Sequence, residues 1–335
     1  MTKIFIVVII FASVSHSFHF EIFRPKITDN RFSFVQGLCS TDHHLLLGTN
    51  TGSVMKIGKD ETGNLKQQTT RSIGKRSVQQ IHAQDDSIVV RMDTNNFGEA
   101  PFGESIVMNP LTLQPHFRLS HRDSHLIYDC MISSRSYWCV YANGRIRKCV
   151  WYDVSKLPKM LHETNVMIRS LRHDERVHLA FHTMKRLFVI TTASRLGWVD
   201  EDYCFHQMHD LSFLGMTTAM FIKQPREDII FAYIGTLNGS VVFLQFNGSE
   251  CIIRNSLQIS DTNNPITQIT SNGGQNIYVG TMDCHIVGFN MISFALIFHI
   301  QANYDQFHSN TDNFIVRKNS IITYDNKKNL ICFIL

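Results

Sequence analysis

Residues 229–257 read IIFAYIGTLNGSVVFLQFNGSECIIRNSL, three apolar runs separated by the pairs Asn238-Gly239 and Asn247-Gly248. Asn-Gly between strand-like runs is the strongest short-range hairpin signal, because both central residues of a tight turn need positive φ and these two tolerate it. The stretch therefore predicts a three-stranded antiparallel meander.

The same succession of an apolar run, a Gly-Thr step, a short turn and a second apolar run occurs elsewhere. Gly48-Thr49 and Gly280-Thr281 repeat the step found at Gly235-Thr236. Comparable turns begin near residues 48, 92, 141, 191, 235, 280 and 324, so successive turns are 44, 49, 50, 44, 45 and 44 residues apart. Blades of a β-propeller are four-stranded sheets of about 40 to 45 residues. We therefore predict an all-β chain that forms a single seven-bladed β-propeller.

The N-terminus has the order of features expected of a secretory signal peptide. Lys3 precedes the apolar run Ile4–Val14, and small residues then precede Phe18. The run is far shorter than the ~20 residues that cross a bilayer, so membrane insertion is not expected. We predict a signal peptide at 1–17, a propeller at 18–335, and secretion or residence in an endomembrane lumen. The alternative is a buried strand at Ile4–Val14 in a cytoplasmic protein.

The two ends of the mature chain are expected to meet in one blade. Phe18–Phe23 alternates apolar and polar residues with the period of a half-buried strand. The last repeat unit stops at Leu335, directly after its third strand. We predict that Phe18–Phe23 supplies the missing strand and closes the last blade, which removes exposed sheet edges.

Composition excludes a strongly basic surface. The net charge is +4, with 18% charged and 44% hydrophobic residues, as in an ordinary globular chain. Nucleic-acid binding is therefore not expected. Between Lys156 and Arg186 seven Lys or Arg stand against three acidic residues, and a solvated loop is the simplest interpretation of that segment.

The eight cysteines have no spacing typical of a compact disulfide framework. If Asn143-Gly144 is a two-residue turn, Cys139 pairs with Lys148 and Cys149 with Trp138. The two thiols would then point to opposite faces of the sheet, so we expect no bond between them. Buried free thiols are the simplest expectation for most of the eight.

Two sequons are candidate glycosylation sites. Asn238 and Asn247 each begin an Asn-Gly-Ser triplet at an expected turn. The conformational needs of the turn explain each triplet equally well, so both interpretations stay open.

The seventeen histidines form no metal motif, since the chain contains no Cys-x-x-Cys and no His-Glu-x-x-His. A Gly-x-Ser-x-Gly elbow and a phosphate-binding glycine loop are also missing. We therefore expect no metal, no cofactor and no catalytic residues.

Leu45–Ile57, followed by Lys75–Ile81 and Ser105–Pro115, resembles the citron-homology propeller of vacuolar tethering subunits. The chain is also similar to degenerate WD-repeat propellers, and Tyr278–Asn290 looks like a quinoprotein-type blade. The first resemblance implies a cytosolic role in vesicle trafficking or tethering. The last implies an enzyme whose active site lies in the central channel.

The repeat and the lack of a catalytic set favour a non-catalytic, secreted or luminal propeller that serves as a monomeric scaffold for a protein or peptide partner. The long turn Asp93–Glu104 carries Phe97 and Phe102, and in propellers such turns share a face with the connectors between blades, one of which contains Arg169 and Arg172. Interface centres favour aromatic residues and Arg, so we predict that these four side chains contribute to a protein-binding face. A loop that folds back on its own blade is the alternative.

Overall fold

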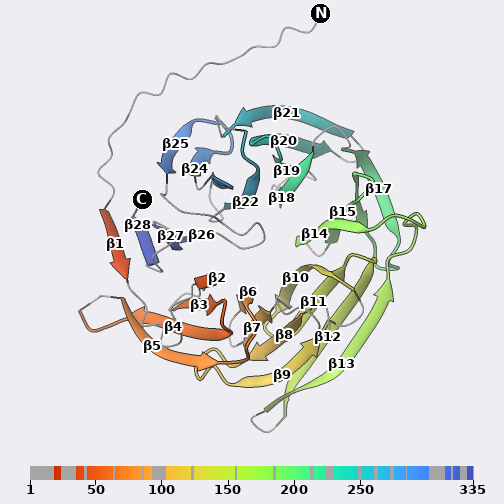
Figure 1. Ribbon diagram of the computed structural model, residues 1–335. Helices are drawn as coiled ribbons and strands as arrows, with labels where there is room; N and C mark the ends of the chain where they lie inside the picture. The colour runs from red at the N-terminus through yellow and green to blue at the C-terminus, as the bar shows by residue number, and fades with distance from the viewer. Residues whose placement is uncertain are drawn as a thin grey trace, which may run out of the picture.

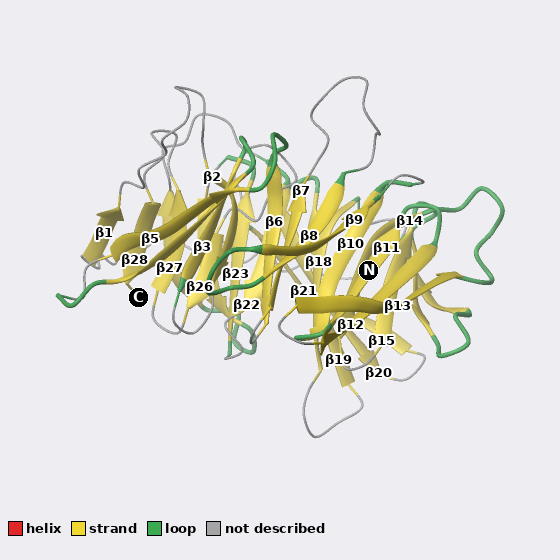
Figure 2. Cartoon of the chain, turned by 90° about the horizontal axis from the view of Figure 1, so that it is seen from below, coloured by secondary structure: helices red, strands yellow, loops and turns green. Residues whose placement is uncertain are grey.

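The computed structural model describes residues 19–23, 35–40, 44–62, 65–84, 87–92, 103–121, 124–154, 157–183, 186–211, 215–223, 229–247, 250–259, 263–271, 275–283, 285–301, 314–317, 320–324 and 330–334. Every regular element in these ranges is a β-strand (Figure 2). A search of the same ranges finds no helix that could span a membrane. The predicted signal peptide, residues 1–17, lies outside them.

The described strands form seven four-stranded antiparallel sheets, and six of these use four strands that are consecutive in the sequence. The first three of the six are β2 (Val35–Ser40), β3 (Leu45–Thr49), β4 (Ser53–Lys59), β5 (Leu65–Ser72); β6 (Val78–Gln84), β7 (Ser87–Met92), β8 (Glu104–Met108), β9 (Pro115–Ser120); and β10 (Leu126–Ser133), β11 (Ser136–Tyr141), β12 (Arg145–Val154), β13 (Leu157–Met167). The next three are β14 (Val177–Thr183), β15 (Arg186–Thr191), β16 (Arg195–Val199), β17 (Phe205–Asp210); β18 (Met216–Lys223), β19 (Ile229–Thr236), β20 (Ser240–Asn247), β21 (Glu250–Gln258); and β22 (Ile266–Ser271), β23 (Asn276–Thr281), β24 (His285–Asn290), β25 (Leu296–Gln301). The remaining sheet joins β1 (His19–Phe23), from the start of the chain, to β26 (Phe314–Arg317), β27 (Ser320–Tyr324) and β28 (Leu330–Ile334).

The sheets stand around a central opening, with the first strand of each consecutive sheet innermost (Figure 1). The inner strands contact one another in sequence from β2 to β26, and β26 contacts β2. An all-β chain that forms a single β-propeller is therefore confirmed. The meander predicted from residues 229–257 is β19, β20 and β21.

The hairpins between the second and third strands differ from the predicted two-residue turns. Gly235 pairs with Val241, and the strands end at Thr236 and begin again at Ser240, which leaves a three-residue loop. Only the last loop residue, Gly239, has positive φ, at 78°. Asn143-Gly144 ends a similar loop, because Val140 pairs with Ile146. Three-residue hairpin loops combine a type I turn with one left-handed residue, so the Asn does not need positive φ.

This extra loop residue corrects the predicted register of β11 and β12. Cys139 pairs with Arg147 and Cys149 with Tyr137, so the two thiols lie on the same face and not on opposite faces. Both cysteines are nevertheless free and buried. A one-residue change in the length of a turn shifts the pairing of the next strand by one residue, which moves its side chains to the opposite face of the sheet relative to the first strand.

The threonine of the Gly-Thr step stabilises these loops. Its side-chain oxygen accepts a hydrogen bond from the backbone N–H four residues later, at 3.0 Å for Thr49, 3.1 Å for Thr236 and 3.0 Å for Thr281. Thr191 makes the same bond at 3.3 Å without a preceding glycine. These threonines are almost completely buried, so the bond satisfies polar groups that water cannot reach.

The glycine of the step is required by the next sheet. A Cβ on Gly48 would lie 2.7 Å from the Cβ of Val78, which begins β6. At Gly235 it would lie 2.7 Å from the Cβ of Ile266, the first residue of β22, and at Gly280 it would lie 2.9 Å from Phe314, the first residue of β26. Each glycine thus lets the next inner strand pack directly against the backbone of the sheet before it.

Apolar side chains fill the spaces between successive sheets. Separate buried clusters lie between each neighbouring pair from the sheet of β2–β5 to the sheet of β26–β28. The core is therefore divided into wedges, as expected where each sheet buries both faces against its neighbours.

We predict that Gly48→Ala lowers the free energy of unfolding by about 1–3 kcal/mol, because the added methyl group overpacks the contact with Val78. Urea denaturation measures the effect. Gly74→Ala is the matched control, since its Cβ meets only the flexible end of Met92 at 3.1 Å. Equal stability of the two variants would contradict the packing role of Gly48.

Candidate protein-binding site

The loops after the second strands lie on the same face as the connectors between sheets. The first connector residue donates its backbone N–H to a loop carbonyl in sheet after sheet. The pairs are Ile73 with Gly52, His121 with Gly103, Ile168 with Gly144, Leu211 with Ser194 and Ile259 with Gly239, at 2.8 to 3.0 Å. Gly103, at the end of the long second-unit turn, therefore lies on the face of the connectors.

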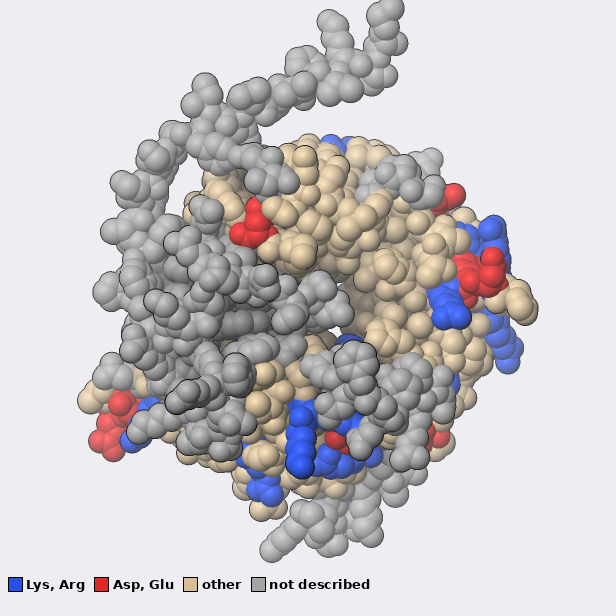
Figure 3. All heavy atoms as spheres, viewed as in Figure 1, with Lys and Arg blue, Asp and Glu red and all other residues tan. Residues whose placement is uncertain are grey.

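The connector that follows β13 carries Arg169 and Arg172 and is firmly attached. The N–H of Arg169 donates to the carbonyl of Tyr203 at 2.7 Å, and the N–H of Phe205 donates to the carbonyl of Arg169 at 3.1 Å. Both arginine side chains remain exposed. In Figure 3, side chains of both charge signs gather at the rim where β13 ends and β17 lies.

A buried ion pair holds the end of this connector. The carboxylate of Glu175, 1% exposed, accepts hydrogen bonds from Arg195, Thr191 and the backbone N–H of Arg172. The hydrogen bond from Arg195 is the largest cause that lowers the pKa of Glu175 to about 2. The predicted solvated basic loop is instead two strands, β13 and β14, joined by a connector that the Glu175–Arg195 ion pair attaches to β16.

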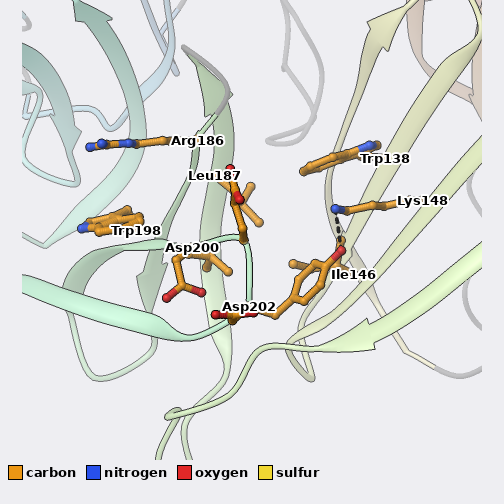
Figure 4. Close-up of a pocket in the computed structure, with 11 residues that line it drawn as sticks. Trp138, Ile146, Lys148, Arg186, Leu187, Trp198, Asp200 and Asp202 are labelled. Atoms are coloured by element: carbon orange, nitrogen blue, oxygen red, sulfur yellow. Dashed lines mark hydrogen bonds between the residues drawn. The ribbon is translucent and has the colours of Figure 1, made fainter.

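A cavity of about 530 Å³ lies beside this connector, between the sheet of β10–β13 and the sheet of β14–β17. Trp138, Ile146 and Lys148 face it from the first sheet, and Leu187 and Val199 face it from the second. The turn before β17 completes the cavity with Asp200, Glu201, Asp202 and Tyr203. Figure 4 shows Trp138 and Lys148 on one side and Leu187, Asp200 and Asp202 on the other. We call this cavity the inter-sheet cleft.

Lys148 is held between two aromatic rings in the inter-sheet cleft. Its Nζ lies 4.0 Å from the ring centre of Trp138 and 4.5 Å from that of Tyr203, and it donates a hydrogen bond of 2.7 Å to the Tyr203 hydroxyl. Such cation–π contacts stabilise an ammonium without neutralising it. Among the described residues no carboxylate forms an ion pair with Lys148.

Trp138 also packs against the neighbouring sheet. Its ring and that of His182 form a T-shaped pair with 5.2 Å between ring centres. Burial lowers the pKa of His182, and the charge of Lys148 lowers it further. His182 is also fixed through its backbone N–H, which donates to the Tyr128 hydroxyl at 3.1 Å. The cleft wall therefore has little freedom to rearrange.

A second cation–aromatic stack, contributed by the β14–β17 sheet, also lines the inter-sheet cleft. Arg186 lies over Trp198 at 4.8 Å, and Trp198 stacks on His206 at 4.6 Å. Both Arg186 and Trp198 point away from Trp138 in Figure 4. His206 approaches Asp200 at 2.6 Å, and this hydrogen bond lowers the pKa of Asp200.

A serine–histidine pair in the core is closed to substrate. Ser105 Oγ lies 2.8 Å from His121 Nε2 and 2.8 Å from the Tyr137 hydroxyl, while His121 Nδ1 lies 2.8 Å from the Tyr141 hydroxyl. Ser105 is fully buried and His121 is 1% exposed. Burial lowers the pKa of His121 to about 4, so the imidazole stays neutral and links β8 to β11 as a structural group.

The central channel contains a second cavity of about 400 Å³ lined from the inner strands. Its described lining includes Leu38, Ile81, Thr218, Gln268 and Phe314 and has no carboxylate, histidine, lysine or arginine. A search of the described residues finds no cluster of three or more groups able to hold a metal ion.

The sequence-predicted contact residues are only partly brought together. Arg169 and Arg172 lie on one exposed connector, whereas Phe97 and Phe102 lie outside the described residues. Asn238 is exposed at its hairpin loop, with its side-chain oxygen accepting a hydrogen bond from Thr236. Asn247 is the last residue of β20.

The inter-sheet cleft was not predicted from the sequence. With Asn143-Gly144 taken as a two-residue turn, Lys148 is paired with Cys139, whereas the structure pairs it with Trp138. A three-residue loop would have placed a cation beside a tryptophan on one face of the hairpin. Tyr203 had no such signal, because it approaches from a different sheet.

A scan against protein-family models and a search of curated proteins found no match. Solved structures do resemble the chain. The β-propeller domain of Cps50 (Swd1) from Myceliophteria thermophila matches with a TM-score of 0.64 at 8% identity, over 90% of this chain and 99% of that one. The fold is that of a β-propeller. BamB from Moraxella catarrhalis matches with a TM-score of 0.52 at 14% identity, over 90% and 84% of the two chains.

We predict that Glu175→Gln lowers the free energy of unfolding at pH 7 by about 3–5 kcal/mol, because Arg195 is left buried without its counter-ion. The folded pKa of Glu175 lies below its ordinary value, so its contribution is complete above about pH 4.5 and is lost as the pH falls toward 2.

Urea denaturation at pH 7 and pH 3 checks this. Wild type should lose more stability on acidification than the variant does. Glu61→Gln is the control, because Glu61 is exposed. An identical acid response in wild type and Glu175→Gln would contradict the assignment.

Proposed function

We propose that this chain is a non-catalytic β-propeller that binds a protein or peptide partner through the inter-sheet cleft. The observation that carries the proposal is Lys148, held between Trp138 and Tyr203 in a cavity lined by both apolar and charged side chains. Aromatic residues with a nearby cation, mounted on rigid strands, are the groups that dominate binding energy at protein interfaces. The cavity volume falls within the range of about 300–1,000 Å³ that is usual for ligand pockets.

The basic connector extends this surface. The backbone of Arg169 bonds to Tyr203, which itself lines the cleft, so the exposed Arg169 and Arg172 adjoin the bound partner. Phe97 and Phe102 belong to the proposal through the sequence alone, as contributors to the connector face. The scaffold acts as a monomer, with the partner covering the cleft and part of this face.

The proposed location is the secretory pathway, either outside the cell or in an endomembrane lumen. The signal-peptide pattern at 1–17 supports it, and the exposed Asn238 is accessible to glycosylation. Asn247 is the second proposed glycosylation site. The sheet that pairs β1 with β28 is proposed as the seventh blade of the mature protein, formed once cleavage frees Phe18.

A cytosolic trafficking propeller of the citron-homology kind is the second candidate. The observation that favours it is the cysteine state, because Cys130, Cys139, Cys149, Cys204 and Cys251 form no disulfide in the structure. Free thiols are common in reducing compartments, whereas disulfides are typical of secreted proteins.

Secretory processing predicts that the mature protein begins at Phe18. N-terminal sequencing of the protein expressed in secretory cells should find Phe18, and peptide-N-glycosidase treatment should change the mass at Asn238.

A mature chain shortened to begin at Arg24 should melt earlier or oligomerise, because β28 loses its partner strand. Retention of Met1 on an intracellular, unglycosylated product would favour the cytosolic candidate instead.

Photo-crosslinking tests the binding site directly. A benzoylphenylalanine at Glu201, on the cleft, should give a discrete protein adduct in cells, whereas the same group at Lys66, on the outer strand β5, should not. Trp138→Ala should reduce the adduct by about tenfold or more, as expected for a central aromatic contact worth ≥2 kcal/mol. Equal adducts at both positions, or no effect of Trp138→Ala in a variant that melts normally, would contradict the proposed site.

A further inference from the structure

The charge of Lys148 has no counter-ion among the described residues of the inter-sheet cleft. Two ring faces and one tyrosine hydroxyl surround its ammonium, and in the described part of the chain no carboxylate pairs with it. An ammonium is a compact charge with three donors. The hydroxyl of Tyr203 takes one of them, which leaves the group able to bind an anion that enters the cleft.

The floor of the cleft is apolar. Ile146, Leu187 and Val199 form it and are 1%, 3% and 6% exposed, while the partly exposed rings of Trp138 and Tyr203 add aromatic surface above it. A carboxylate that reached Lys148 would therefore need an apolar group close to it to fill the rest of the cleft.

The turn that borders the cleft has the opposite charge. Glu201 and Asp202 are exposed, and no side-chain partner of either carboxylate occurs among the described residues. Asp200 differs, because His206 lies 2.6 Å from its carboxylate. A ligand whose anionic group binds Lys148 therefore binds more tightly if it also carries a cationic group that reaches Glu201 and Asp202.

We propose that the inter-sheet cleft binds the C-terminal end of a partner protein. The chain-terminal carboxylate pairs with Lys148. The side chain of the last residue is apolar and lies over Ile146 and Leu187. A Lys or Arg shortly before the last residue meets Asp202. A terminal residue carries its carboxylate and its side chain on the same carbon, which matches the adjacency of Lys148 and the apolar wall. An internal Asp or Glu brings no such apolar group. This inference rests on the proposed protein-binding function.

The probe is the peptide acetyl-Gly-Lys-Lys-Gly-Leu with a free carboxylate, titrated into the full-length protein as expressed. Binding is followed by the indole N–H signals of the tryptophans. The amidated peptide should bind about tenfold more weakly or worse, since amidation removes the charge that pairs with Lys148. Replacing the terminal Leu with Ser, or raising the salt concentration, should also weaken binding.

Variants of the protein test which of its charged groups bind the peptide. Lys148→Met should abolish the difference between acid and amide, while Lys148→Arg retains part of it. Lys66→Met, which removes an exposed charge from β5, is the matched control and should behave as wild type. Asp202→Asn should weaken binding of the lysine-containing peptide and leave the version with two alanines in place of the lysines unchanged.

Equal affinity of the acid and the amide for the wild-type protein would overturn the proposal without any variant. Tighter binding of an amidated peptide with an internal Glu would overturn the chain-end assignment. If no peptide binds but the photo-crosslinker at Glu201 still captures a partner, this inference fails and the protein-binding function stands. If peptides bind as expected and the crosslinker captures nothing in cells, the proposed cellular function fails.

Discussion

Three junctions of the ring depend on one kind of contact, in which the first residue of an inner strand packs against a glycine backbone of the preceding sheet. Val78 on Gly48, Ile266 on Gly235 and Phe314 on Gly280 repeat this contact. Without a side chain at the glycine, the next strand approaches closely enough for the wedges of core to fill. At these three junctions the distance between the two sheets is therefore set where the inner strand of one meets the second strand of the other.

The threonine after each of these glycines pairs a backbone group that this close packing buries. Close packing buries the hairpin backbone, and buried N–H groups must be paired. The hydroxyl of Thr236 pairs with the N–H of Ser240, and Thr49 and Thr281 repeat the bond. Gly and Thr thus form one unit, in which the first residue brings two sheets together and the second satisfies the backbone that this approach hides from water.

The sheets of β10–β13 and β14–β17 depart from this rule, and the inter-sheet cleft lies between them. The Gly-Thr step is missing in both, since Val140-Tyr141 and Ile190-Thr191 occupy the corresponding positions, and it is also missing from β7, which ends in Arg91-Met92. Here the connection is reinforced by polar contacts, from the Glu175–Arg195 ion pair to the backbone bridge between Arg169 and Tyr203. A binding cavity thus occurs where apolar wedge packing is supplemented by charged and aromatic groups.

The repeat period and the Gly-Thr steps were sufficient to predict an all-β propeller, because strand length and turn chemistry are local properties of the chain. Loop length was not, since Asn-Gly suits both two-residue and three-residue hairpins, and the difference of one residue hid the pairing of Trp138 with Lys148. The place of the Arg169–Arg172 connector and the approach of Tyr203 depended on contacts between different sheets. The sequence by itself therefore determined the blade, and only the tertiary structure decided which side chains from neighbouring blades share a cavity, because that depends on the packing distance and twist between sheets.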